Sequence, residues 1–201
     1  MSLENPREYP NNKQENWVAY RESPEFLRGI KKLEEFYKIN HQSKLIVLAV
    51  ALNVKKAGVF NAPDAEISYT EEMLSELGLF FYEDLEGKEW LSQHGWKGDT
   101  RYLIGATMSD LDEAIIASGK DDHIEFGRAM DFPETSVIAY TDKSKLAPFD
   151  DPRLTDEEKA FRFFRFSDEN FEEEVVWLEQ IIAAIKHYSP AIYSEVMSMN
   201  S

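Results

Sequence analysis

The chain has 201 residues, 43% of them hydrophobic, and its 13 Phe, 9 Tyr and 4 Trp can build a core without disulfide bonds or metal ions, which excludes a disordered chain. Because it has no cysteine, a disulfide framework, a thiolate zinc site and a cysteine nucleophile are excluded together. The chain contains 22 Lys and Arg residues and 38 Asp and Glu residues. The resulting net charge of −16 repels nucleic-acid phosphates and anionic lipids.

The first residues predict a short arm rather than a targeting segment. Residues 1–15 are polar and contain Pro6 and Pro10, which indicates a flexible N-terminal arm, and residues 16–201 are expected to form a single domain. The longest apolar run, Leu45–Leu52, is far shorter than the roughly 20 residues that cross a membrane. We therefore expect a cytoplasmic protein that binds neither nucleic acid nor a membrane.

The first predicted elements are helical. Ser23 followed by Pro24 is a favoured helix start, and the pattern predicts a helix over residues 24–39. One face of that helix carries apolar residues at helical spacing: Phe26, Ile30, Leu33 and Tyr37. The run Leu45–Leu52 fits either a helix or a buried strand. Its alanines and the start at Ser43 favour the helix.

Two strands are predicted in the middle of the chain, over residues 79–82 and 101–107. Thr70 is expected to cap a short helix before the first strand, and Ser109 to open a helix after the second that reaches residue 118. The remaining segments are expected to be a turn at Glu86–Gly87 and a loop over residues 90–99.

Short helices are predicted over residues 121–130 and 134–140, separated by the breaker Asp131-Phe132-Pro133-Glu134. A polar connector follows over residues 142–152, and Thr155 begins a capping box. Aromatic residues alternate with Arg162 and Arg165 over residues 161–166, which favours a strand.

A long helix is predicted after Ser167, with acidic residues in its first turn. A separate terminal helix is predicted after Pro190. The apolar stripe of the long helix comprises Phe171, Val175, Leu178, Ile182 and Ile185. We expect the stripe to pack on the domain's own core, and a coiled-coil homodimer through it is the alternative. Together these elements predict an α+β fold, a helix-rich single domain with a small sheet of about three to four strands.

Sequence motifs for catalysis are absent. The chain has no phosphate-binding G-x-x-x-x-G-K-[ST] or G-x-G-x-x-G and no G-x-S-x-G nucleophile turn, so we expect no cofactor and no evident catalytic motif. The densest set of metal-ligand types is Asp121, Asp122, His123 and Glu125, which could offer oxygen ligands to a hard cation. The structural interpretation, in which these residues form an acidic first turn stabilised by the helix dipole, is favoured over a metal site.

Arg128 has two interpretations. In the favoured one, it forms an ion pair with Glu134 that locks the turn between two helices. In the other, Arg128 binds an anion while His123 and Glu125 handle protons, and together with Glu134 these residues form the candidate catalytic set.

The segment His123–Tyr140 resembles part of a group of uncharacterised prokaryotic domains of unknown function. Their segment reads roughly Glu-x-Gly-Arg-x-x-Gly-Tyr-Pro-x-Cys-Cys-Val-x-x-Phe. The matching positions here are Glu125, Gly127, Arg128, Phe132, Pro133, Val137 and Tyr140. Asp131 stands at the glycine of that pattern, while Thr135 and Ser136 stand at its cysteines.

A second stretch is also similar to those domains, in which a Cys-Ser-x-x-Cys element opens a late helix. Phe166 and Asn170 occupy its two cysteine positions in this chain. The resemblance implies that any metal or redox chemistry of cysteine-bearing relatives is not shared by this chain, and it implies no known activity.

The function expected from these observations is a binding or regulatory module without an evident catalytic motif. Its acidity suits a basic protein partner, and a homodimer is the other expected assembly. The alternative is a small cation-assisted hydrolase with a site around residues 121–134.

Overall fold

The centre of the fold is a three-stranded antiparallel sheet surrounded by helices, which confirms the predicted helix-rich α+β class. The computed structural model describes residues 17–95 and 97–199, so the predicted arm over residues 1–15 lies outside the described residues. No helix in those described ranges combines the length and the apolar character that crossing a membrane requires.

The sheet has the strand order β1-β3-β2, with β1 at Ala57–Pro63, β2 at Phe80–Glu83 and β3 at Asp99–Gly105. The α-helices are α1 Trp17–Arg21, α2 Pro24–Glu35, α3 His41–Ala51, α4 Ile67–Glu76, α5 Leu85–Gln93, α6 Met108–Ser118, α7 His123–Ala129, α8 Glu134–Tyr140, α9 Asp156–Phe161, α10 Phe171–Tyr188 and α11 Pro190–Met199. Short 3₁₀ turns lie at Asp64–Glu66 and Lys143–Lys145.

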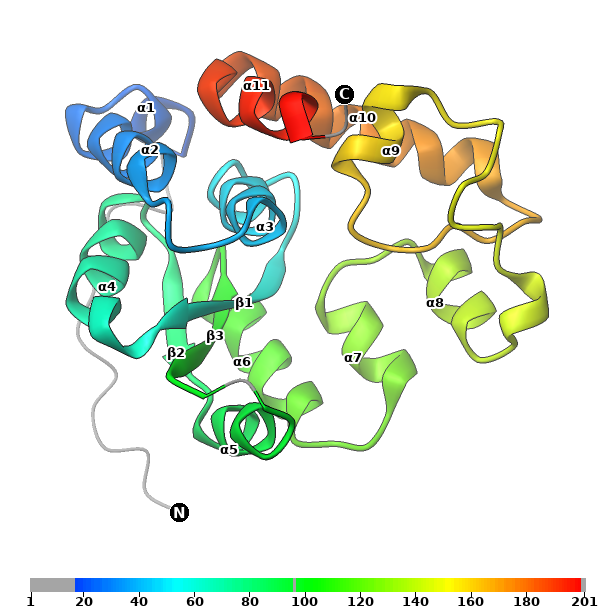
Figure 1. Cartoon of the computed structure of the whole chain (residues 1–201), viewed down its shortest axis with the longest axis horizontal. Helices are drawn as coiled ribbons and strands as arrows, with labels where there is room; N and C mark the ends of the chain where they lie inside the picture. The colour runs from blue at the N-terminus through cyan, green and yellow to red at the C-terminus, as the bar shows by residue number, and fades with distance from the viewer. Residues whose placement is uncertain (1–16, 96, 200–201) are drawn as a thin grey trace.

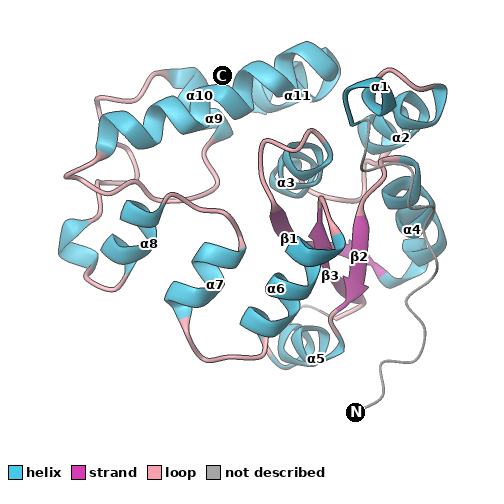
Figure 2. Cartoon of the chain, turned by 180° about the vertical axis from the view of Figure 1, so that it is seen from behind, coloured by secondary structure: helices cyan, strands magenta, loops and turns pink. Residues whose placement is uncertain are grey.

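Both faces of the sheet are covered, because β3 buries side chains on both sides. Tyr102 pairs with Phe60 of β1, and their stacked rings belong to the main core, which also contains buried residues of α2, α3, α4, α10 and α11. On the opposite face Leu103 packs with Leu111 and Ala114 of α6. Figure 2 shows α6 in front of the strands, while α7 and α8 lie on the side away from α1, α2 and α4 (Figure 1).

Helix starts follow the sequence closely where a side chain caps them. Ser23 Oγ accepts a hydrogen bond from Phe26 N at 3.1 Å, as predicted for α2. The segment Leu45–Leu52 is helical, as favoured, although Asn40 rather than Ser43 caps α3. Helix α2 ends at Glu35, four residues early, so Tyr37 is 83% exposed instead of joining the buried face.

Two predicted starts and one predicted turn are wrong. Helix α4 begins at Ile67, which places Thr70 inside it as a buried residue, and the box that opens α6 is Thr107 with Asp110 rather than Ser109. The predicted turn at Glu86–Gly87 lies within α5, and that helix takes part of the predicted loop. Asp84 Oδ1 accepts from Gly87 N at 2.9 Å, and this short-range bond starts the helix.

The strand β1 was not predicted, and the predicted strand over residues 161–166 does not form. Gly58, Asn61 and Pro63 all disfavour strands, but β1 pairs with β3 over its full length. In the second segment, Phe161 ends α9 and residues 162–166 are irregular. Their aromatic rings pack on several neighbours at once instead of alternating across a sheet.

The stripe of α10 packs inside the chain, as the favoured interpretation predicted. Phe171, Leu178, Ile182 and Ile185 are each at most 4% exposed in the main core, and Val175 packs against it partly buried. The stripe is therefore not open to a coiled-coil partner.

Gly105 at the end of β3 allows α6 to pack closely on the sheet. A Cβ atom there would lie 2.6 Å from Leu111 N, whereas one at Gly119, which has a φ of −80°, would meet nothing nearer than 3.9 Å. We expect Gly105→Ala to lower the free energy of unfolding by about 2–3 kcal/mol, because the backbone of α6 must shift. Urea denaturation measures the change, with Gly119→Ala as the control that leaves stability nearly unchanged. Equal stability of the two variants would contradict this packing.

Candidate functional site

The two helices of the segment singled out by sequence are joined by a tight turn. Asp122 caps α7 by accepting from Ile124 N at 2.9 Å, and at the other end Phe132 N donates to Gly127 O at 3.1 Å. Asp131 between them has a φ of 58°, a left-handed conformation that an aspartate adopts at a cost. This backbone aims Phe132 back beneath the helices.

Arg128 forms the ion pair with Glu134 that the favoured interpretation predicted. Its Nε donates to Glu134 Oε2 at 2.8 Å, and this hydrogen bond lowers the pKa of the Glu134 carboxyl. Both side chains are about half exposed, and neither lines either of the two cavities described below. Arg128 therefore closes the turn on the outside of the molecule.

The candidate metal ligands do not gather at one point. Asp121 is exposed, Asp122 is engaged as the cap of α7, and Glu125 forms an ion pair with Lys120. Within residues 17–95 and 97–199, no group of three His, Asp or Glu side chains is placed to hold a metal ion. Of the six candidate site residues, His123 alone reaches the cavity described next.

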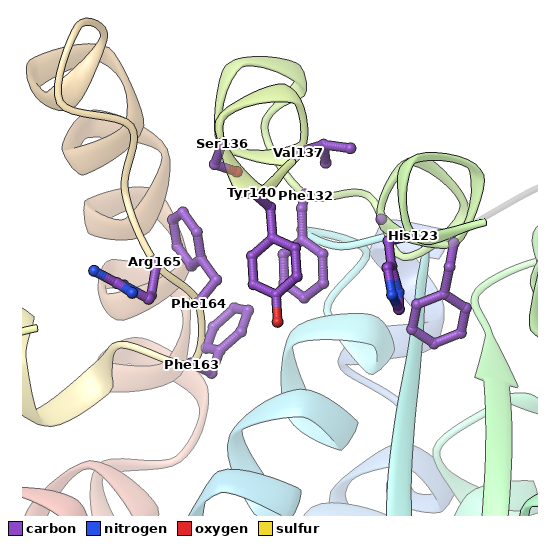
Figure 3. A pocket seen from close by; sticks show the side chains of 10 residues that line it. His123, Phe132, Ser136, Val137, Tyr140, Phe163, Phe164 and Arg165 are labelled. Carbon is purple, nitrogen blue, oxygen red and sulfur yellow. The ribbon is translucent and has the colours of Figure 1, made fainter. Parts of the chain in front are cut away.

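A pocket of about 330 Å³ opens between α7, α8 and the irregular segment 162–166 (Figure 3). It is lined by His123, Phe126, Gly127, Phe132, Ser136, Val137, Tyr140, Phe163, Phe164 and Arg165, and we call it the aromatic pocket. Four of these residues are phenylalanines and none carries a carboxylate. In Figure 3 the ring of Tyr140 stands across the pocket, between His123 on one side and Phe163 and Phe164 on the other.

The few polar groups of the aromatic pocket are partly occupied already. Ser136 Oγ donates to Pro133 O at 2.8 Å, and Arg165 donates to Ala147 O at 2.9 Å with its guanidinium directed away from Tyr140 (Figure 3). The rings of His123 and Tyr140 meet edge to face with centroids 6.2 Å apart. An imidazole and a phenol are thus the polar groups that a molecule in the pocket would meet.

The buried charged residue that sequence reasoning missed beside this pocket is Lys55, which the sequence shows only as half of the basic pair Lys55-Lys56. It precedes β1, and its side chain is 2% exposed. Its Nζ lies 4.1 Å from the ring centroid of Phe132, 5.8 Å from that of Phe163 and 6.0 Å from that of Trp177, three rings that we call the aromatic cage. No hydrogen-bond partner for Nζ is found in the described part of the chain.

Burial dominates the electrostatics of Lys55. Desolvation lowers the pKa of its amine to about 7, and the negative charge of Asp131 opposes this shift only in part. Asp131 is held nearby because its Oδ2 accepts from Lys56 N at 3.1 Å. Near neutral pH, Lys55 is therefore a partly uncharged amine, unlike an ordinary surface lysine.

The aromatic cage and the aromatic pocket share a wall. Phe132 and Phe163 belong to both, and Phe164 packs edge to face on Trp177 with centroids 5.2 Å apart. The segment 162–166 is irregular because its rings fill this cluster from several directions.

The two segments on which the resemblance to uncharacterised domains rests lie side by side. Thr135 Oγ1 donates to Glu174, whose other oxygen accepts from Ser167 N at 2.7 Å. Glu174 is buried, and desolvation raises the pKa of its carboxyl. Thr135 and Asn170 also line a smaller cavity of about 210 Å³. The resemblance itself stays a prediction.

No protein-family model matches this sequence, and no curated protein or solved structure shows significant similarity to it.

The low pKa of Lys55 makes stability depend on pH in a defined window. Between pH 7 and 10.5 the unfolded chain holds a proton at Lys55 that the folded chain has lost, so stability due to this residue rises with pH across the window. We expect Lys55→Met to have a higher free energy of unfolding than the parent chain at pH 6. This difference is expected to be smaller by about 2–3 kcal/mol at pH 9.5. Denaturant titrations at both pH values measure it. A difference that does not change with pH would contradict burial of a neutral amine.

Proposed function

We propose that this chain is a binding protein and that the aromatic pocket is its binding site for a small, mostly apolar molecule. The observation that carries the proposal is the pocket itself, because its volume of about 330 Å³ and its lining of four phenylalanines with an imidazole and a phenol are typical of small-molecule sites. Binding is also the role that the sequence, with no catalytic motif, favours.

The lining favours an aromatic ligand with no positive charge. Flat rings on two sides of the pocket offer stacking and edge-to-face contacts to another ring. Its lining contains no carboxylate to pair with a ligand cation, and the amine of Lys55, which is partly charged near neutral pH, lies next to two of the lining rings. An uncharged or singly anionic molecule of about the size of a phenylpropyl group fits these properties.

The test is binding of 3-phenylpropanol and 3-phenylpropylamine, followed by chemical-shift changes in ¹H–¹⁵N NMR spectra. The alcohol is expected to shift amide signals of residues 123–140 and 163–165 with saturation, and the amine to bind more weakly. Tyr140→Ala is expected to weaken binding of the alcohol about tenfold, because the ring that crosses the pocket is lost.

Tyr37→Ala is the matched control, since Tyr37 is exposed and lies outside the pocket lining. The proposal fails if the alcohol shifts no signals in the two segments, or if both tyrosine variants bind it equally.

The cation-assisted hydrolase gains no support from the positions of Asp121, Asp122, His123 and Glu125. We therefore expect Mg²⁺, Mn²⁺, Ca²⁺ and Zn²⁺ to leave the melting temperature of the chain unchanged, because no cluster of ligands is present in the described residues to bind them. Thermal melts with and without each ion measure this. A rise of several degrees with one ion, abolished by Asp122→Ala, would revive the hydrolase.

A further inference from the structure

Two lysines of this chain are buried to the same extent but in opposite ways. Lys44 is 2% exposed, and its Nζ donates to Glu34 O at 3.0 Å and to Glu195 Oε2 at 2.8 Å. Lys55 is equally buried, but its Nζ has ring faces and no acceptor in the described residues. Lys44 therefore has two hydrogen-bond acceptors, whereas none for Lys55 lies in the part of the chain that the structure describes.

The position of Lys55 relative to the aromatic pocket makes this difference chemically useful. Phe132 and Phe163 contact the amine and also line the pocket, so the amine and a molecule bound there would share two neighbouring rings. Phe132 is the nearer ring, and it follows the strained left-handed residue Asp131 in the turn between α7 and α8. For the amine to reach a ligand in the pocket, the side chain of Phe132 would have to move aside.

We propose that Lys55 is a nucleophilic amine and that the natural ligand of the aromatic pocket carries an aldehyde or ketone group, which forms an imine with it. The proposal rests on the pocket being a binding site and names the chemical class of its ligand. A desolvated lysine beside an apolar cavity is the arrangement in which an amine attacks carbonyl compounds near neutral pH.

The reaction requires no reagent beyond the two partners. The nitrogen lone pair of the neutral amine attacks the carbonyl carbon, and one nitrogen-bound hydrogen moves to the carbonyl oxygen to give a carbinolamine. Loss of the hydroxyl group with the second nitrogen-bound hydrogen releases water and leaves a carbon–nitrogen double bond. His123 and Tyr140 line the same pocket and carry groups that can transfer protons.

The probe that tests this is 3-phenylpropanal with sodium cyanoborohydride, which reduces an imine to a stable secondary amine. At pH 7.5 and limiting probe, peptide mass spectrometry of the full chain is expected to find Lys55 labelled at least about tenfold faster than any other lysine, because far more of this amine is uncharged. Lys55→Arg is expected to abolish the fast labelling, and Lys44→Arg to leave it unchanged. Circular dichroism confirms the folding of each variant.

Phe132→Ala tests the shared wall. Its removal is expected to slow the labelling of Lys55 severalfold, because this ring both keeps water from Nζ and lines the pocket that holds the probe. Labelling spread evenly over the lysines, or a rate at Lys55 unchanged by Phe132→Ala, would overturn the proposal.

Competition separates this proposal from the one on which it rests. An excess of 3-phenylpropanol is expected to slow the labelling of Lys55, because both molecules occupy the aromatic pocket. If the alcohol binds by NMR but Lys55 is not labelled faster than other lysines, the imine proposal falls and the binding site stands. If the alcohol neither binds nor competes, the binding site itself falls.

Discussion

A buried lysine, with no hydrogen-bond acceptor among the described residues, is the constraint around which this half of the molecule is arranged. The rings that enclose Lys55 come from three separate places: Phe132 from the turn after α7, Phe163 from the segment after α9, and Trp177 from α10. A cation over desolvated ring faces gains about 2 kcal/mol, whereas burial of an unpaired charge costs several. The aromatic cage therefore tolerates the amine best when it is uncharged.

The same aromatic rings connect the properties of Lys55 with those of the aromatic pocket. The rings that exclude water from Nζ also line an apolar cavity, so one cluster both lowers the pKa of the amine and forms a wall of the proposed binding site. Asp131 limits the fall in the pKa of Lys55, since its negative charge favours the ammonium form, and the backbone N–H of Lys56 holds its carboxylate in place. The positive φ of Asp131 is the local cost of this arrangement.

Much of the fold follows from short-range signals in the sequence. Ser23 and Thr155 cap their helices as predicted, and the spacing of apolar residues in α10 gives its buried face. The failures lie where long-range contacts override local preference. Strand β1 contains residues that disfavour strands and forms only because β3 pairs with it, while the rings of residues 162–166 pack in a cluster that no local pattern reveals.

The candidate site shows the same division. Sequence reasoning found the segment 121–140 and the ion pair between Arg128 and Glu134, because both depend on residues close together in the chain. For the charged residues it favoured a structural role, and they do finish the ends of the helices; the cavity, which it did not foresee, is built by aromatic residues. Lys55 was out of reach, since its neighbours Phe132 and Trp177 are far along the chain and nothing in its local sequence predicts burial.

The most direct test is the ionisation of Lys55 itself, measured by NMR on the chain labelled with ¹³C at the lysine Cε atoms, over a range of pH. The account predicts one resonance, absent from Lys55→Met, with a titration midpoint near pH 7. A Lys55 resonance that titrates together with the surface lysines would show that water or a counter-ion reaches the amine, and it would contradict the aromatic cage as described.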